Sequence, residues 1–259
     1  MTDTSQTALV NQQFGSRAEA YLASAVHAQG ADLADLAALV RERPAARVLD
    51  LGCGGGHVTF HVAPHARDVV AYDLSTEMLA VVDRAARERG FANVTTQQGS
   101  AEHLPFADGH FDVVMSRYSA HHWRDLALGL REAARVLAPG GVVAIVDSVS
   151  PGIPVRDTYL QALELLRDCS HVRSYTRGEW ESALAGAGLR CRNSRSYRVW
   201  LDFATWVERM RTPTPQIAAI RALQAAVAGE VSAYFETAPD GSFSLDVALF
   251  EATRGAEPR

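Results

Sequence analysis

Apolar and polar positions alternate along this chain in blocks that predict strands and helices in turn. Short apolar runs at 47–51, 69–73, 93–97, 111–116 and 142–147 have the length and bounding turn residues of buried strands. Longer amphipathic stretches between most of them, at 57–66, 76–89 and 124–137, predict helices. Alternation of this kind is typical of a mostly parallel sheet with helices on both faces, so the pattern predicts a Rossmann-like, doubly wound α/β fold.

The segments on either side extend this core. Residues 1–13 are polar and predict a loose tail, and helices are expected at 16–29 and 32–43. Residues 151–189 read as helices after a Pro-Gly-Ile-Pro break. Residues 191–199 and 242–250 are the expected last two of seven strands, and 202–236 reads as an aromatic-rich helical insertion between them. We therefore expect one domain over 1–259, divided into an N-terminal helical lid (1–43), a cofactor-binding core (44–150), substrate-side helices with the sixth strand (151–241) and the last strand (242–251).

The most informative segment is Val-Leu-Asp-Leu-Gly-Cys-Gly-Gly-Gly-His at 48–57, which predicts a strand, a glycine turn and a helix start. A second acid, Asp73, ends the next predicted strand 23 residues after Asp50. Glycines allow the backbone to approach a ligand closely, and an acid at the end of the next strand can accept hydrogen bonds from two ribose hydroxyls. The pattern indicates a site for an adenosine-containing cofactor.

Two phosphate-binding motifs are absent from this segment. A dinucleotide fingerprint G-x-G-x-x-G starting at Gly52 would need a glycine where His57 stands. All 25 Lys+Arg residues are arginines, which excludes the phosphate-binding lysine of P-loop proteins, Schiff-base catalysis and pyridoxal phosphate enzymes. The remaining interpretation is a nucleoside site without a phosphate clamp.

Asp50 to Gly56 resembles the first motif of class I S-adenosylmethionine (SAM) methyltransferases, an acid followed by G-x-G-x-G. The resemblance continues in order at 73–75, 98–106, 111–117 and 137–142. Within this superfamily the chain is similar to the UbiE-like set, and there to bacterial YafE-like proteins, on the segments 14–22, 116–123, 167–173 and 206–213. That similarity covers nearly the whole chain and implies no particular substrate.

The resemblance implies SAM as cofactor, S-adenosylhomocysteine (SAH) as product and a small-molecule methyl acceptor whose C-, O- or N-nucleophile stays open. Gly52 and Gly54 are then expected at the methionine portion and Asp73 at the ribose. Ser100 departs from the acid that the family often has at the adenine side. The full set of implied cofactor contacts is Tyr21, Asp50, Gly52, Gly54, Asp73, Leu74, Met78, Ser100, Ala101 and Arg117.

Proton chemistry is expected at 117–123, where the fourth strand ends, because parallel sheets bind ligands at the carboxyl ends of their strands. His122, His121 and Tyr118 are the catalytic candidates, with His122 favoured as a base since histidine titrates near neutrality. The alternative is that one histidine only satisfies local backbone. Arg117 has two alternative partners, the cofactor carboxylate or a substrate anion. The segment with Phe14 and Tyr21 is either a lid over the cofactor or a helix on the sheet edge.

Composition restricts the partners. A net charge of −5 argues against a nucleic-acid surface, and the three cysteines lack metal-ligand spacing, so we expect no metal. No stretch approaches the roughly 20 apolar residues of a membrane span, so we expect no membrane insertion and a cytoplasmic protein. The oligomeric state stays undetermined. Two alternatives to methyl transfer remain open: a regulatory protein that binds SAM or SAH, and transfer of another SAM-derived group.

Overall fold

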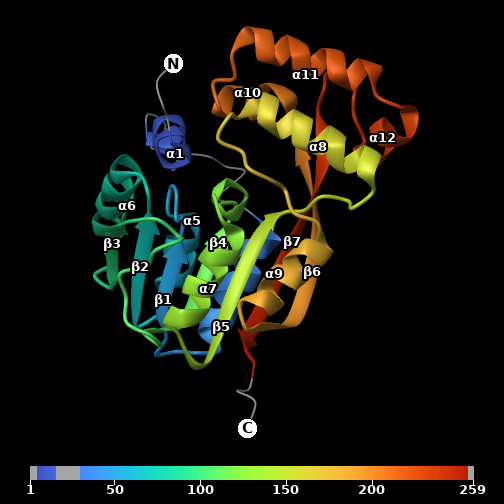
Figure 1. Cartoon of the computed structure of the whole chain (residues 1–259). Helices are drawn as coiled ribbons and strands as arrows, with labels where there is room; N and C mark the ends of the chain where they lie inside the picture. The colour runs from blue at the N-terminus through green and yellow to red at the C-terminus, as the bar shows by residue number, and fades with distance from the viewer. Residues whose placement is uncertain (1–4, 16–29, 256–259) are drawn as a thin grey trace.

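A seven-stranded sheet forms the centre of the computed structural model, which describes residues 5–15 and 30–255 (Figure 1). The strand order is β3-β2-β1-β4-β5-β7-β6. Strands β1 to β5 pair in parallel, whereas β7 is antiparallel to both β5 and β6. The predicted mostly parallel, seven-stranded fold is confirmed, and the sheet is mixed. The strands are β1 (Arg47–Leu51), β2 (Asp68–Asp73), β3 (Val94–Gln98), β4 (Phe111–Arg117), β5 (Leu137–Ser148), β6 (Leu189–Leu201) and β7 (Phe243–Arg254).

Helices cover both faces of this sheet because its central strands are apolar on both sides. One face packs against α4 (Ala31–Arg41), α5 (His57–Val62) and α6 (Thr76–Glu88). The other packs against α7 (Leu126–Val136) and α9 (Arg177–Gly186). Strands with two buried faces read as continuous apolar runs, which is the pattern seen in the sequence.

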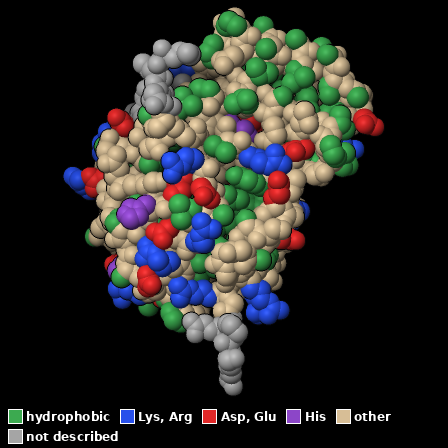
Figure 2. Space-filling model, viewed as in Figure 1, with side chains coloured by type: hydrophobic (Ala, Val, Ile, Leu, Met, Phe, Trp, Pro, Cys, Tyr) green, Lys and Arg blue, Asp and Glu red, His purple; other side chains and the backbone are tan. Residues whose placement is uncertain are grey.

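A helical cap stands beyond one end of the sheet (Figure 1). It has its own apolar core, in which Trp206, Phe235 and Phe243 are almost completely buried. The predicted aromatic-rich insertion is therefore a packing unit resting on the ends of β6 and β7. In the view of Figure 2, hydrophobic side chains gather over the cap, whereas charged side chains lie mainly over the sheet-bearing part. The cap helices are α8 (Pro154–Arg167), α10 (Phe203–Arg209), α11 (Thr214–Ala226) and α12 (Gly229–Tyr234).

The N-terminal prediction was wrong in one respect. The expected loose tail over 1–13 contains the helix α1 (Gln6–Gly15). Its Phe14 packs against Met78 and Val81 of α6, and such tertiary contacts stabilise a short helix that would be marginal alone. The helix predicted at 16–29 lies outside the described residues.

The carboxyl ends of β1, β2 and β4 meet at the edge of the sheet that faces α1 and the cap (Figure 1). Local capping sets where the chain turns from this edge into helices. Ser75 accepts a hydrogen bond from the Met78 backbone at the start of α6 (3.2 Å), and Asp125 does the same for Leu128 at the start of α7 (2.9 Å). Strand-end side chains are thereby brought together at one edge.

Candidate active site

The glycine turn after β1 uses positive backbone angles that other residues adopt at a cost. Gly52 has a φ of 73° and Gly54 a φ of 49°. A Cβ on Gly52 would lie 1.9 Å from Ser119 Oγ, whereas a Cβ on Gly54 would meet nothing within 4 Å. Gly52 is therefore required by the protein's own packing, and Gly54 leaves open space.

Asp73, the last residue of β2, faces this turn. Its Oδ2 accepts from the Gly54 backbone and its Oδ1 from the Ser75 backbone, both at 2.9 Å. Burial raises the pKa of Asp73, although these backbone donors act in the opposite direction. Ser75, not Asp73, caps α6. The carboxylate is thus held in place by backbone donors on both oxygens.

Asp50 is the residue before the last of β1 and is almost completely buried. Its Oδ2 accepts from the Thr59 backbone (2.9 Å) and the Thr59 hydroxyl (2.6 Å), which ties β1 to α5. Its Oδ1 is buried and has no hydrogen-bond partner within the described residues. Burial raises the pKa of Asp50 to about 6. A buried carboxylate with one uncompensated oxygen is ready to accept a donor from a bound molecule.

These groups line one cavity, closed on one side by Gln6, Thr7, Val10 and Phe14 of α1. Most of the predicted site residues line it: Asp50, Gly52, Gly54, Asp73, Leu74, Met78, Ala101, Arg117, Tyr118 and His122. His121 and Ser100 do not, and Tyr21 lies outside the part of the chain that the structure describes.

The adenine-side segment differs from expectation in which side chain it presents. The Ser100 hydroxyl donates to the Glu102 carboxylate, and it is Glu102 that lines the cavity. Glu102 Oε1 also accepts from the Arg124 backbone at 2.9 Å. Sequence reasoning missed Glu102. The sequence offered one signal: Ser100 stands where the family often has an acid, and an acid follows two residues later.

A second cavity lies against the first and shares four lining residues with it, Phe14, Arg117, Tyr118 and His122. Part of its wall is apolar and comes from β6, β7 and α10. The sequence predicted that the sixth strand lies on the substrate side and that aromatic residues there, among them Trp200 and Trp206, could line a pocket. It did not predict Leu245 and Val247 of the last strand, which only the tertiary fold brings beside the histidines. The apolar lining residues of these elements are Val199, Trp200, Leu201, Trp206, Leu245 and Val247, and Met210 directly after α10 joins them.

Arg117 stands in the wall between the cavities. Its Nε donates to the carboxylate of Asp32 on α4, and its guanidinium lies 4.6 Å from the centre of the Tyr118 ring. Tyr118 has an unusual φ of 52°, and burial raises the pKa of its hydroxyl, which therefore stays protonated at neutral pH. The positive charge predicted to meet an anion is thus already paired with Asp32.

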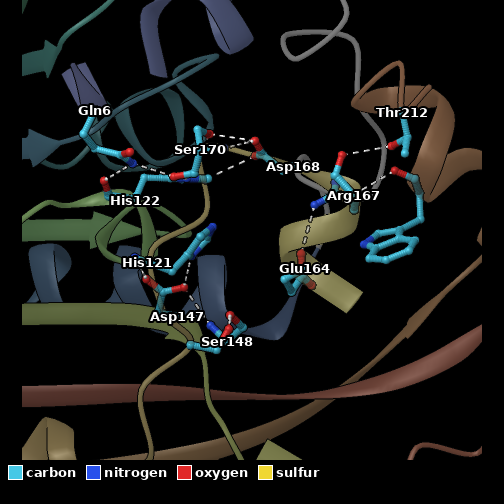
Figure 3. Close-up of polar contacts among 12 residues, drawn as sticks. Gln6, His121, His122, Asp147, Ser148, Glu164, Arg167, Asp168, Ser170 and Thr212 are labelled. Carbon is cyan, nitrogen blue, oxygen red and sulfur yellow. Dashed lines mark hydrogen bonds and ion pairs between the residues drawn. The ribbon is translucent and has the colours of Figure 1, made fainter. Parts of the chain in front are cut away.

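The two adjacent histidines, His121 and His122, both lie in the short helix η1 (Ala120–His122) but have different surroundings (Figure 3). His121 Nδ1 lies 2.5 Å from Asp147 Oδ1, and its backbone N–H donates to Asp147 Oδ2 at 3.1 Å. Burial alone would lower the pKa of His121, but the Asp147 carboxylate outweighs this and the pKa is raised. His121 lines the second cavity.

His122 lacks such a close carboxylate. Its Nδ1 donates to the Ser170 carbonyl at 3.1 Å, and its Nε2 is 3.9 Å from Asp168 Oδ2 (Figure 3). Burial, followed by the neighbouring His121, lowers the pKa of His122 to about 4. His122 is therefore neutral around pH 7, and its ring meets Phe14 edge-on at 4.9 Å between centroids.

A third histidine, His171, completes the cluster at 5.6 Å from His121 between ring centroids. Burial lowers the pKa of His171 to about 2. Within residues 5–15 and 30–255, no three His, Cys, Asp or Glu side chains are arranged to hold a metal ion. The three cysteines are free thiols. None of the described helices has the length and apolarity to span a membrane.

Comparison with known proteins matches residues 49–145 to a family model described as a methyltransferase domain. The chain is 48% identical over 205 residues to the uncharacterized protein YafE of Escherichia coli, covering 79% of this chain and 99% of that protein. A demethylmenaquinone methyltransferase of Chlorobaculum parvum is 40% identical over 111 residues, covering 42% of this chain and 44% of that protein.

A similar solved structure is that of YcgJ from Bacillus subtilis, with a TM-score of 0.83 and 32% identity over 87% of this chain and 99% of that one. In sequence, the YcgJ methyltransferase is 36% identical over 200 residues, covering 77% of this chain and 79% of that protein. These matches confirm the predicted resemblance, and the chain belongs to the methyltransferase family that includes YafE and YcgJ.

Proposed function

We propose that this methyltransferase uses SAM and transfers its methyl group to a small molecule held in the second cavity. The observation that carries the proposal is the meeting of two cavities at one wall, the first lined by the glycine turn and Asp73 and the second lined by His121. Two alternatives remain: a protein that binds SAM without turnover, and transfer of another SAM-derived group. The experiment below distinguishes the binding protein from an enzyme.

The residues of the first cavity fit a nucleoside cofactor with a cationic amino acid portion. Asp73 has lone pairs for the ribose hydroxyls, and the buried Asp50 Oδ1 lacks a partner among the described residues. Open space over Gly54 accommodates the cofactor's approach. Leu74, Met78 and Ala101 supply apolar contacts for the adenine, beside Glu102.

When bound, SAM supplies a methyl group on a positively charged sulfur, which is intrinsically reactive toward a nucleophile. The protein's contribution is alignment and the exclusion of water. Helix α1 covers the first cavity through Val10 and Phe14, and the two cavities share lining residues, so a methyl group in the first would lie next to an acceptor in the second. His121, His122 and Tyr118 are the side chains at hand for proton transfer. The free thiols are compatible with the cytoplasm.

Calorimetry with SAM, SAH and NAD tests the cofactor. We expect roughly micromolar dissociation constants for SAM and SAH and none measurable for NAD. Tighter binding of NAD than of SAM would contradict the assignment. SAH release in the presence of a small-molecule fraction of cell extract then identifies an enzyme, whereas SAM binding without any SAH release would identify a binding protein.

A further inference from the structure

Asp147 fixes the orientation of His121. The Asp147 side chain, on β5, is only 1% exposed and contacts both the ring Nδ1 (2.5 Å) and the backbone N–H (3.1 Å) of His121. A carboxylate at Nδ1 keeps the proton on that atom, so the lone pair is on Nε2. Because His121 lines the second cavity and not the first, Nε2 is the basic nitrogen that the ring offers to the acceptor side.

The surroundings of His121 favour its protonated form. The carboxylates of Asp147, Glu164 and Asp168 all act to raise its pKa, whereas burial lowers it. His122 and His171 remain neutral and do not repel a new positive charge at pH 7. The ionisable groups around the ring are Asp147 of β5, Glu164 and Arg167 of α8, Asp168 at the end of α8, His122 of η1, Tyr118 after β4, and His171 and Arg173 of the following loop.

The second cavity is lined by charges of both signs: Arg117, Arg167, Arg198 and Arg209 on one side of the balance, and Asp32, Glu164 and Asp168 on the other. Arg117 is paired with Asp32, Arg167 lies 3.4 Å from Glu164, and the Arg198 guanidinium donates to Asp246 at 2.8 Å. Much of the remaining wall is apolar, from Val199 and Leu201 of β6 to Trp206 of α10. A cavity of this kind favours an uncharged molecule with an apolar body over an anion or a cation.

We infer that His121, oriented by Asp147, is the general base of the reaction and that the acceptor is an uncharged, mainly apolar molecule with a weakly acidic hydroxyl, such as a phenol or enol. This rests on the proposed function. His121 Nε2 takes the hydroxyl proton while the acceptor oxygen forms a bond to the methyl carbon. The methyl–sulfur bond breaks and its electron pair stays on sulfur. The products are a methyl ether, neutral SAH and an imidazolium that returns its proton to solvent.

A chromogenic phenol tests the base without requiring turnover. 4-Nitrophenol absorbs differently as phenol and as phenolate, and we expect wild-type protein saturated with SAH to shift the bound probe toward phenolate. His121→Gln should abolish the shift, and Asp147→Asn should weaken it because the amide no longer stabilises the imidazolium. His110→Gln, which changes an exposed histidine at the other end of β4, should leave the shift intact.

Three further measurements complete the test. Histidine NMR should give His121 a pKa above 6.5 that falls in Asp147→Asn, and SAH release with a phenol acceptor should drop about 10²–10⁴-fold in His121→Gln. Calorimetric SAM affinity should be unchanged in these variants, since His121 does not line the first cavity. Two outcomes would refute the base role of His121 and leave the proposed function standing. In both, wild type binds SAM normally, and the probe either shows no shift in wild type or shifts equally in wild type and His121→Gln. Failure of wild type to bind SAM overturns both the base role and the proposed function.

Discussion

At the scale of single residues, the first cavity contains carboxylates whose oxygens can accept further hydrogen bonds. Asp73 accepts backbone hydrogen bonds on both oxygens, from Gly54 and Ser75. Asp50 keeps one buried oxygen without a partner among the described residues. His121 and His122 are neighbours in sequence, yet one has a carboxylate at 2.5 Å and the other a backbone carbonyl at 3.1 Å.

Asp73→Ala tests the residue scale directly. Removing a charged acceptor should weaken SAM binding by about 1.5–3 kcal/mol in calorimetry, while circular dichroism shows a folded protein. The matched control is Asp68→Ala, at the other end of the same strand, where the side chain is 54% exposed and pairs with Arg67. Equal SAM affinity in the two variants would show that Asp73 does not hold the cofactor.

At the scale of elements, the glycine turn and α1 shape the first cavity from opposite sides. The turn has positive φ angles, and its Gly54 backbone N–H donates to Asp73. Helix α1 contacts α6 through Phe14, and Gln6 donates to the Ser170 carbonyl at 2.7 Å, which connects the helix to the loop between α8 and α9 (Figure 3).

Gly54→Ala and Gly90→Ala form a matched pair at this scale. Both glycines have positive φ, 49° and 75°, and an added Cβ meets nothing within 4 Å of either. Each substitution should therefore cost about 1–2 kcal/mol of unfolding free energy in urea, from backbone strain alone. Only Gly54→Ala places a methyl group in the cofactor cavity, so SAM affinity should fall at least about 10-fold in that variant alone. Unchanged SAM affinity in Gly54→Ala would place the cofactor elsewhere.

At the scale of the whole molecule, the histidine cluster links folding to pH. His122 and His171 have folded pKa values of about 4 and about 2, below the ordinary 6.5. The unfolded chain therefore binds protons that the folded protein does not, and these two residues make stability fall as pH drops below 6.5. His121, whose pKa is raised, acts in the opposite direction.

Urea unfolding at pH 7 and pH 5 measures this linkage. His171→Gln should lose about 1.5–2 kcal/mol less stability over that range than wild type, because one buried neutral imidazole is gone. The amide can keep a hydrogen bond to Gln161, which His171 contacts at 3.2 Å. His110→Gln, an exposed change, should behave as wild type. The same pH dependence in His171→Gln and wild type would refute the linkage.

The sequence by itself determined the α/β fold, the glycine turn and most of the residues that line the first cavity, because these depend on local periodicity and short spacings. Asp50, Gly52 and Asp73 could be predicted since each lies at or near the end of a strand or in a turn, and parallel strands bring such ends to one edge. The same locality explains the errors. The helix α1 depends on contacts with α6 that periodicity does not report.

Only the tertiary structure decided which histidine meets a carboxylate and what surrounds the second cavity. Asp147 is 26 residues from His121, and Val199 and Leu245 come from the last two strands, so no short spacing indicates that they share a site. Glu102 lines the first cavity and Ser100 does not, and the Ser100 hydroxyl donates a hydrogen bond to the Glu102 carboxylate. Long-range packing sets the electrostatic surroundings of a titratable group, and these surroundings distinguish His121 from His122.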